Sequence, residues 1–387
     1  MIKFIDLKTQ QIKIRSKVEN RIKKILDHGQ YILGPEVDEL QSKLSKFCGS
    51  RYVLCCSSGT DALLLGLLGL GLKPGDGVLV PSFTFASSAE VMPLLGAIPI
   101  FVDVDKSNFN ISANSIQAGI DTAKKKKINL KGIMTVGLFG QPCNMDEINK
   151  IANKNQLWVL DDAAQSLGAT FKGKPVGNLA KVTATSFFPS KPLGCYGDGG
   201  AIFTNSKKIY DIAYSTHLHG MGKDRYTYER LGMNGRMDSI QAAIIIEKLR
   251  IFQSELKLRN KVANQYIKVF TELNTKITLP KIISQCTSNW AQFTIILPNS
   301  INREALREKL SKKQIPTAIY YPIPLHKQKP YKNFPVSVDG LKNTEYLCKN
   351  VISLPMHPYL TFKEITFMLS VCNDFPFFAI NLNRFIK

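Results

Sequence analysis

A single lysine lies in a stretch whose neighbours mainly shape the backbone. The sequence TSFFPSKPLGCYGDGGA, residues 185–201, places Lys191 between Pro189 and Pro192 and follows it with four glycines. Ordering such residues costs conformational entropy, so the stretch indicates that a particular loop shape is needed. It could be a surface connection between two elements. Alternatively it holds a reactive lysine, because a lysine amine can form a Schiff base with a carbonyl compound.

Two aspartates end the apolar part of LWVLDDAAQS, residues 157–166. A carboxylate at the end of a buried strand is costly unless it meets a cation or a hydrogen-bond donor. One of them could instead cap the helix that follows. The functional alternative is a carboxylate held against a cationic heterocycle. Because side chains alternate along a strand, one of Asp161 and Asp162 should face the site and the other should face away.

Small residues follow another predicted strand in the sequence SSGTDA, residues 57–62. At a strand-to-helix turn, Gly59 would leave backbone N–H groups free at a helix N-terminus, and such groups bind phosphate. Alone the signal is weak, because Ser58 or Thr60 could serve only as a helix N-cap.

The elements that carry these stretches alternate through the first two thirds of the chain. Apolar strand patterns occupy residues 51–58, 77–83, 98–105, 131–140, 157–165 and 182–188. Helical patterns separate most of them, which is typical of a parallel sheet with helices on both faces. Ligands bind such sheets beyond the carboxyl ends of the strands. We therefore expect the three polar stretches to meet at one edge of a single sheet.

A phosphate cradle, a carboxylate and a lysine together match the needs of pyridoxal phosphate. Its phosphate needs N–H donors and hydroxyls, its pyridine nitrogen needs an acid, and its aldehyde needs a lysine amine. Each feature alone is weak, but the three in this order on one sheet favour this cofactor.

At these residues the sequence resembles the DegT/DnrJ/EryC1/StrS family of nucleotide-sugar aminotransferases. The resemblance covers nearly the whole chain and implies an α/β fold of pyridoxal-phosphate fold type I, which is aspartate aminotransferase-like. Such a fold has a large domain with a mostly parallel sheet and a small C-terminal α/β domain. The matching stretches include HGQYILGPEVDELQSKLSKFCG, SSGTDALLLGL, LFGQPCNMDEI, DDAAQSLGA, GMNGRMDSIQAA, YYPIPLHKQ and LPMHPYL. Within the family, SFFPSKPLGCYGDGGA and YILGPEV are most similar to aminotransferases acting on UDP-2-acetamido-2-deoxy-3-oxo-glucuronate.

The resemblance implies cofactor roles for individual residues. Lys191 would bind the cofactor covalently and then act as the general base that moves the proton. Asp162, rather than Asp161, would pair with the pyridine nitrogen. Gln165 would contact the side of the 3-oxygen, and Phe85 would stack on the ring unless it is an ordinary core aromatic. The implied phosphate contacts are Gly59, Thr60, Ser186 and, from the neighbouring subunit, Asn234.

The resemblance also implies contacts with the substrate, at Arg236, His219, Tyr320, Tyr321 and His326. Arg236 could neutralise a carboxylate or phosphate of the substrate, although a structural ion pair would also explain it. Lone histidines are more often satisfied structural residues, which is the alternative for His219 and His326. Tyr320 stands where relatives often have histidine, so the identity of the sugar stays open.

The implied function is transamination in two half-reactions. L-Glutamate would give its amino group and leave pyridoxamine phosphate, and a keto-sugar nucleotide would then take the amine for the biosynthesis of surface polysaccharide such as lipopolysaccharide O-antigen. The best match is a UDP-linked 3-keto sugar of the 3-oxo-GlcNAc uronate type. The alternative is a dTDP- or UDP-linked 3- or 4-keto-6-deoxy sugar. Because Asn234 would reach the neighbouring active site, we expect a homodimer with active sites at the subunit interface.

Two rival functions share this fold. A pyridoxal-phosphate sugar dehydratase would have histidine in place of Lys191. A non-catalytic regulatory relative would have no need of the complete set that includes Asp162, Gln165 and Ser186.

The composition of the chain indicates which ligands and which cellular compartment to expect. The 387 residues carry a net charge of +21, from 51 Lys and Arg against 30 Asp and Glu, which permits anionic ligands. No basic–aromatic motif supports nucleic-acid binding. Eight cysteines without metal or disulfide spacing indicate a reducing compartment and no metal site. The longest apolar run, residues 62–72, is too short to span a bilayer, and the N-terminus lacks the apolar core of a signal peptide, so we expect a cytoplasmic protein.

The pattern changes around residues 239–252, where a strong helical pattern precedes a second, basic helix. After residue 276 come a predicted strand at 289–298, a helix at 303–315 and a strand at 316–324. We expect a large cofactor-binding domain over residues 1–250, with residues 1–12 packing on a small C-terminal domain over 251–387. The apolar, basic segment 375–387 is expected to be a packing tail or a contact with a partner or membrane.

Overall fold

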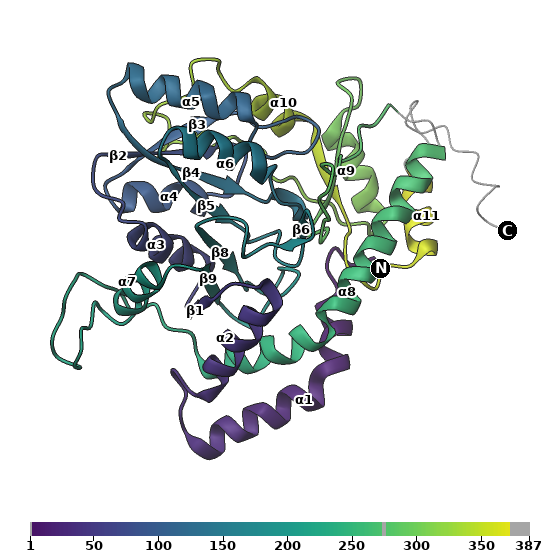
Figure 1. Cartoon of the computed structure of the whole chain (residues 1–387). Coiled ribbons are helices and arrows are strands. Elements are labelled where there is room, and N and C mark those ends of the chain that lie inside the picture. Colours follow the sequence, from purple (N-terminus) through teal and green to yellow (C-terminus); the bar gives the residue numbers. More distant parts are fainter. Residues whose placement is uncertain (1, 273–275, 372–387) are drawn as a thin grey trace.

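Seven strands form one sheet at the centre of the larger part of the molecule (Figure 1). The computed structural model describes residues 2–272 and 276–371. β9 runs antiparallel to both of its neighbours, and the other pairings are parallel. The remaining strands therefore point the same way and end at the same edge. Across the sheet the strands are β1 (Tyr52–Cys56), β9 (Gly200–Thr204), β8 (Val182–Ser186), β5 (Trp158–Asp162), β4 (Asn129–Val136), β2 (Asp76–Pro81) and β3 (Ile98–Val102).

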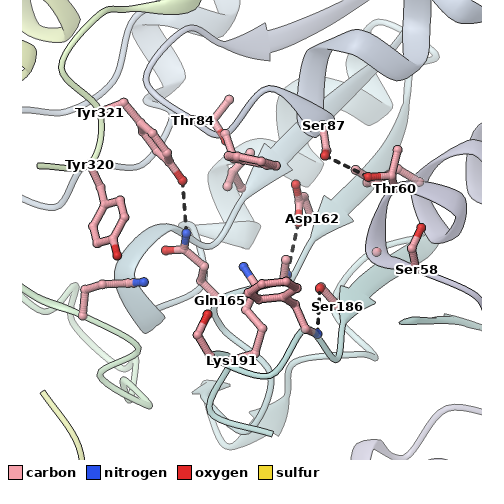
Figure 2. Close-up of a pocket in the computed structure, with 18 of the residues that line it drawn as sticks. Ser58, Thr60, Thr84, Ser87, Asp162, Gln165, Ser186, Lys191, Tyr320 and Tyr321 are labelled. Atoms are coloured by element: carbon pink, nitrogen blue, oxygen red, sulfur yellow. Dashed lines mark hydrogen bonds between the residues drawn. The ribbon is translucent and has the colours of Figure 1, made fainter. Parts of the chain in front are cut away.

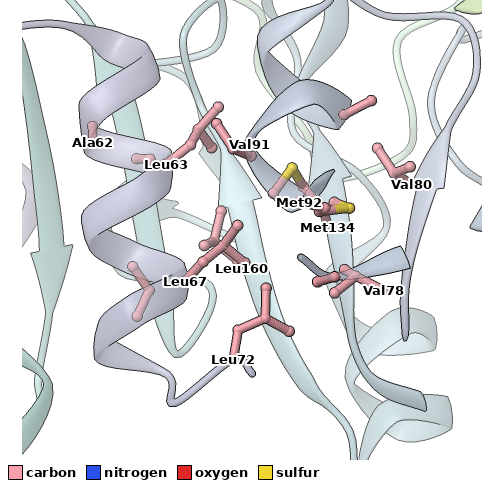
Figure 3. Packing of buried hydrophobic residues seen from close by; sticks show 14 of the residues in the cluster. Ala62, Leu63, Leu67, Leu72, Val78, Val80, Val91, Met92, Met134 and Leu160 are labelled. Atoms are coloured by element: carbon pink, nitrogen blue, oxygen red, sulfur yellow. The ribbon is translucent and has the colours of Figure 1, made fainter. Parts of the chain in front are cut away.

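Helices cover both faces of this sheet because its strands are apolar on both sides. Along β2, Val78 and Val80 pack with Leu63, whereas Leu79 between them packs with Ile116 on the other face. Figure 3 shows the first of these faces. Its helices are α3 (Gly59–Gly69), α4 (Ser87–Leu94) and α7 (Lys207–His217). The helices of the other face include α2 (Pro35–Cys48), α5 (Ala113–Lys125) and α6 (Met145–Lys154).

A second core lies around the C-terminal half of the long helix α8 (Ser239–Glu272) (Figure 1). Tyr266 and Phe293 stack in it with ring centroids 4.5 Å apart. The expected pair of helices is thus one continuous helix of 34 residues. The other elements here are β10 (Phe293–Ile296), α9 (Arg303–Lys312), α10 (Lys342–Asn350), β11 (Val351–Leu354) and α11 (Phe362–Ser370).

The expected strand at residues 316–324 is not formed. The antiparallel partner of β10 is β11, from later in the chain. Ala318 makes a single bridge to Ser353 of β11. Tyr320 and Tyr321, which follow it in the chain, line the cavity described below. The three prolines of this stretch favour an irregular path, since proline lacks the N–H that a strand partner needs.

The N-terminal segment contacts both parts of the molecule. Helix α1 (Leu7–His28) packs on α8 through Ile14 and Val18, which meet Ile244. Ile2 is buried in the C-terminal core, and the N–H of Met356 donates to the carbonyl of Phe4 at 3.1 Å. A boundary at residue 250 falls inside α8, so the division into two domains stays a prediction.

The short elements complete the description. They are β6 (Thr170–Phe171), β7 (Lys174–Pro175) and the 3₁₀ turns Leu138–Gly140 and Leu325–Lys327. Among the helices of residues 2–272 and 276–371, none is both long and apolar enough to cross a membrane. The same residues contain no cluster of three metal-ligating side chains of the His, Cys, Asp or Glu type. The predicted tail 375–387 lies outside the described residues.

Candidate active site

A cavity of about 630 Å³ opens at the carboxyl ends of the parallel strands (Figure 2). Its walls come from the loops after β1, β2, β5 and β8 and from the segment around residues 292–321. Many of the residues predicted from the sequence line it together: Gly59, Thr60, Phe85, Asp162, Gln165, Ser186, Lys191, Tyr320 and Tyr321. The expectation that three distant polar stretches share one sheet edge therefore agrees with the arrangement of the chain.

The start of α3 forms one wall of the cavity. Ser58 is its N-cap, and its Oγ accepts a hydrogen bond from the N–H of Asp61 at 3.0 Å. The backbone N–H groups of Gly59 and Thr60 precede this capped turn, where helical partners are lacking. A Cβ added to Gly59 would lie 2.6 Å from the Cβ of Ser186. Only glycine therefore lets the helix start approach the end of β8 this closely.

The two aspartates at the end of β5 point in different directions. Asp162 lines the cavity, where Ser88 donates a 2.7 Å hydrogen bond to its Oδ2 and the N–H of Ala164 donates to Oδ1 at 3.1 Å. Burial raises the pKa of Asp162, which these donors and Lys191 oppose. Asp161 is fully buried on the other face, and there burial raises its pKa to about 7. The strand alternation thus decides which carboxyl faces the cavity.

Lys191 stands on the loop after β8 and extends toward Asp162 (Figure 2). The loop is tight, because the N–H of Lys191 donates to the carbonyl of Phe188 at 2.8 Å. Burial lowers the pKa of the Lys191 amine, and the nearby carboxylate of Asp162 opposes this shift. A larger neutral fraction of the amine makes it a better nucleophile and base.

Gln165 is buried and held by three elements. Its Oε1 accepts a 2.8 Å hydrogen bond from the N–H of Phe139, and its Nε2 donates to the hydroxyl of Tyr321 at 3.3 Å. Its carbonyl accepts a 2.7 Å hydrogen bond from Nδ2 of Asn289. These contacts fix the amide in the wall of the cavity that Asp162 also lines.

The aromatic rings of Phe85, Tyr320 and Tyr321 line the cavity. Phe85 is 59% exposed although it is apolar, and its ring centroid lies 6.3 Å from that of Tyr321. Tyr320 lines the cavity beside Tyr321 (Figure 2), with the two ring centroids 5.9 Å apart. An exposed ring at the wall of a cavity leaves a flat apolar face for a planar ligand.

Four predicted residues lie outside the lining of this cavity, and three of them lie between α7 and α8. His219 and Asn234 are exposed on the extension between α7 and α8, whose strand-like bridge joins Leu218 to Asn234. Arg236 is half-buried, and its Nε has no hydrogen-bond partner among the described residues. Burial and the positive charge of Arg236 together lower the pKa of the neighbouring His217 to about 4.

His326 also lies outside the lining, and both of its ring nitrogens have protein partners. Nδ1 is 2.8 Å from the Oγ of Ser82, at the end of β2, and Nε2 is 3.2 Å from Oε1 of Glu345. The N–H of His326 also donates to the Oγ of Ser82 at 3.1 Å. This histidine therefore ties the turn at residues 325–327 to the central sheet. That arrangement favours the structural alternative left open by the sequence.

Sequence reasoning did not single out two side chains that the structure brings to the site. Ser88 holds Asp162 from the first turn of α4, yet its only signal is a serine near a predicted helix start. Gln292 lines the cavity from the residue before β10. An amide beside a strand has no distinctive signal, because its role depends on a contact between parts distant in the sequence.

Comparison with known proteins agrees with the geometry. The sequence model of the DegT/DnrJ/EryC1/StrS aminotransferase family matches residues 12–372 of this chain. The UDP-2-acetamido-2-deoxy-3-oxo-D-glucuronate aminotransferase of Pseudomonas aeruginosa is 44% identical, over 93% of this chain and 96% of that protein. A DegT/DnrJ/EryC1/StrS aminotransferase structure from Brucella abortus has a TM-score of 0.93 and 40% identity, with 97% and 99% of the chains covered. The NtdA structure from Bacillus subtilis, with bound cofactor PMP, has a TM-score of 0.84 and 29% identity, covering 95% and 83%.

These matches confirm two expectations drawn from the motifs. The resemblance extends over nearly the whole chain, as predicted, and the solved relatives share the α/β architecture with the mostly parallel sheet. The Pseudomonas aeruginosa relative also bears the name that the loop around Lys191 and the YILGPEV stretch suggested. The chain belongs to the DegT/DnrJ/EryC1/StrS aminotransferase family.

Proposed function

We propose that this aminotransferase moves an amino group from L-glutamate to a keto-sugar nucleotide. Its cofactor is pyridoxal 5′-phosphate, which becomes pyridoxamine phosphate between the two half-reactions. When bound, this cofactor supplies an aldehyde that accepts the amino group and a ring that withdraws electrons. The observation that carries the proposal is that Lys191 and Asp162 line the same cavity in a chain 44% identical to a sugar-nucleotide aminotransferase.

The shape of the α3 wall fits the phosphate of this cofactor. Cβ atoms are excluded not only at Gly59 but also at Gly200, where one would lie 2.2 Å from the carbonyl oxygen of Ser58. These two positions therefore carry no side chain at the helix N-terminus, where a phosphate needs backbone N–H donors. The hydroxyls of Thr60 and Ser186 line the same wall and supply further donors.

Asp162 and Lys191 suit the pyridine nitrogen and the aldehyde of the cofactor. The buried carboxylate of Asp162, oriented by Ser88, would hold the pyridine nitrogen protonated. Lys191 would bind the aldehyde carbon and, once displaced by the amino donor, would take the proton from the donor's Cα through its Nζ. Its lowered pKa favours the free amine that this proton transfer needs.

A UDP-linked 3-keto sugar of the 3-oxo-GlcNAc uronate type is the substrate we favour. Support comes from the name of the Pseudomonas aeruginosa relative and from the coverage of both chains at 44% identity. The alternative is a dTDP- or UDP-linked 3- or 4-keto-6-deoxy sugar. The product in either case is an amino-sugar nucleotide of the kind used in surface polysaccharides such as lipopolysaccharide O-antigen.

We also propose that the protein acts as a cytoplasmic homodimer with active sites at the subunit interface. Asn234 is exposed and outside the cavity of its own chain, which suits a contact with the partner's cofactor phosphate. His219 and Arg236 belong to the same neighbourhood and are proposed, together with Tyr320, Tyr321 and His326, for the substrate side.

Absorbance spectroscopy of the purified holoenzyme tests the proposal. We expect a yellow protein whose colour is bleached by L-glutamate and restored by a keto-sugar nucleotide. The reverse reaction starts from amino-sugar nucleotides and 2-oxoglutarate. Assaying a panel of UDP- and dTDP-linked amino sugars in this direction would identify the sugar. Lys191→Ala should abolish turnover while cofactor still binds. A bound cofactor that no amino donor bleaches would instead indicate the non-catalytic relative.

A further inference from the structure

Two hydroxyl groups form a hydrogen-bond chain that ends on the carboxylate of Asp162. Ser88 donates a 2.7 Å hydrogen bond to Oδ2 of Asp162, and the Oγ of Ser88 lies 2.9 Å from Oγ1 of Thr84. All three residues are buried. Water therefore competes little for these contacts, and the protein itself determines how the carboxylate is oriented.

The direction of the two hydrogen bonds follows from the number of protons. A carboxylate can only accept hydrogen bonds, and a serine hydroxyl has one proton to donate. Ser88 uses that proton on Asp162, so the proton between Thr84 and Ser88 comes from Thr84. A hydroxyl that accepts one hydrogen bond becomes a better donor in another, because the two bonds polarise each other. Thr84 therefore strengthens the contact between Ser88 and the carboxylate.

The chain of hydroxyls stabilises the charged form of Asp162. Burial raises the pKa of this carboxyl, and the hydrogen bond from Ser88 is the largest effect that opposes the rise, ahead of the N–H of Ala164 and the charge of Lys191. A carboxylate that is stabilised by donors takes a smaller share of a proton that it holds jointly with a base. The ring nitrogen of a bound cofactor would therefore keep its proton.

The donors to Asp162 are divided between its two oxygens. Ser88 bonds to Oδ2, and the N–H of Ala164 bonds to Oδ1 at 3.1 Å. Each oxygen of a carboxylate can accept about two hydrogen bonds, so both retain capacity for another donor. Asp162 is 6% exposed and lines the cavity, where a protonated ring nitrogen would supply that donor.

The same hydroxyls close the loop that carries Phe85. Thr84 precedes this ring, and the N–H of Ser88 donates to the carbonyl of Phe85 at 3.2 Å. In the same loop, the Oγ of Ser87 lies 2.9 Å from Oγ1 of Thr60 on the α3 wall (Figure 2). The loop 84–88 therefore connects the aromatic side of the cavity and the α3 wall with the carboxylate at the end of β5.

We propose that Thr84 is a positioning residue, which through Ser88 orients the carboxylate of Asp162 toward the ring nitrogen of the cofactor. The inference rests on the proposed function, because it requires Asp162 to hold that nitrogen protonated. It gives a role to Thr84, to which the motifs assign none. Thr84 acts through the hydroxyl of Ser88 and not by contact with the cofactor.

The ring nitrogen of the bound cofactor reports on this role directly. In holoenzyme prepared with ¹⁵N-labelled pyridoxal phosphate, the nitrogen chemical shift distinguishes a protonated from an unprotonated ring, and the unaltered enzyme should give the protonated value. Thr84→Val keeps the shape of the side chain but lacks the hydroxyl. Its signal should move toward the unprotonated value, because the carboxyl group takes a larger share of the proton. Thr84→Ser, which keeps the hydroxyl, should restore the signal.

The rates should follow the nitrogen signal. With glutamate and a keto-sugar nucleotide, kcat of Thr84→Val should fall about 3- to 10-fold, as expected for the loss of one hydrogen bond, and KM should change little. Ser88→Ala removes the middle of the chain and should lose more, both in the signal and in kcat. Because it adds no bulk, Ser88→Ala also tests the chain if Thr84→Val does not fold.

A second background and a control separate this role from a structural one. In Asp162→Asn enzyme, Thr84→Val should leave the nitrogen signal where it is, because the group that it orients is absent. Thr122→Val is the matched control, since Thr122 is a buried threonine of α5 whose hydroxyl donates to the carbonyl of Ala118 at 2.7 Å. It should lower stability and change neither the nitrogen signal nor kcat.

Two results would overturn the inference alone. One is a Thr84→Val holoenzyme with the nitrogen signal of the unaltered enzyme, whatever its stability. The other is a shift caused by Thr84→Val that persists in Asp162→Asn enzyme, which would mean that Thr84 contacts the cofactor itself.

The unaltered holoenzyme tests the proposed function separately. An unprotonated ring nitrogen there would refute the role of Asp162, and this inference with it. A protonated nitrogen in an enzyme that converts no keto-sugar nucleotide would refute the proposed substrate, and the role of Thr84 would stand on the nitrogen signals of its variants.

Discussion

Gly59 and Ser186 approach so closely that a Cβ on the glycine would lie 2.6 Å from the Cβ of the serine. One belongs to the start of α3 and the other to the end of β8, two elements that are far apart in the sequence. The contact brings backbone N–H groups and a hydroxyl to the same point. A single methyl group added at Gly59 should therefore distort this wall of the cavity.

The first prediction concerns Gly59→Ala. The added methyl group should push α3 away from Ser186, so pyridoxal phosphate should bind to the apoenzyme about 10- to 100-fold more weakly, as expected for losing one or two hydrogen bonds to a charged phosphate. Titration of the cofactor absorbance measures this. Gly173→Ala is the control, since its site is open but has a φ of +74°. It should cost stability and leave cofactor affinity unchanged. Equal affinities for Gly59→Ala and the unaltered enzyme would contradict a phosphate role for this wall.

The second prediction compares neighbouring aspartates of β5. Asp162→Asn removes the charge that would keep a pyridine nitrogen protonated, so kcat should fall by about 100- to 1,000-fold, as for other electrostatic contacts at a reacting group. Asp161→Asn, on the opposite face, should retain most of the activity. Steady-state rates with glutamate and a keto-sugar nucleotide measure both. A greater loss for Asp161→Asn would reverse the assignment of the two carboxyls.

The third prediction is a pH dependence of stability at Asp161. Its folded pKa of about 7 lies above the ordinary value of 3.8 because the carboxyl is buried, with Thr135 as a hydroxyl donor at 2.7 Å. A raised carboxyl pKa stabilises the fold at low pH, and this contribution is lost as the pH rises toward 7. The free energy of unfolding should therefore fall by about 1.4 kcal/mol per pH unit in this window relative to Asp161→Asn.

Urea unfolding of both holoenzymes between pH 5 and pH 8 measures that difference. Asparagine can still accept the hydrogen bond from Thr135 but does not titrate. The two stability curves should converge at low pH and separate toward pH 7, with the Asn variant the more stable there. Parallel curves would show that the carboxyl of Asp161 titrates alike in the folded and unfolded chain.

The fourth prediction separates two roles of His326. Its ring joins Ser82 to Glu345, so His326→Ala should lower the free energy of unfolding by about 1–3 kcal/mol and loosen the segment that carries Tyr320. KM for the sugar should rise while cofactor binding is kept. His326→Asn can retain the bond to Ser82 and should restore most of both properties. If Asn restores stability and the high KM persists, the histidine contacts the substrate directly.

Much of the central sheet could be expected from the sequence because its signals are local. The strands are apolar runs, their ends carry polar residues, and parallel strands bring those ends together. Strand alternation alone separated Asp161 from Asp162, although the choice of the inward one came from the family resemblance. The motif around Lys191 was specific enough to name that family, which the matches confirm.

Other features depend on contacts that no local pattern contains. The partner of β10 comes from Val351–Leu354, and the tyrosine-rich stretch expected to be a strand serves instead as a wall of the cavity. His326 could be recognised as a bridging residue only once Ser82 and Glu345 were placed beside it. Gln292 was missed for the same reason, since one glutamine before a strand resembles any other.

The backbone of Phe139 connects two walls of the cavity. Its N–H donates to Oε1 of Gln165, and its carbonyl accepts a hydrogen bond from the N–H of Gln292, so the turn after β5 and the start of β10 are both attached to one residue. A shift of the backbone at residue 139 should therefore move both walls together, whereas a substitution of one lining side chain should leave their spacing unchanged.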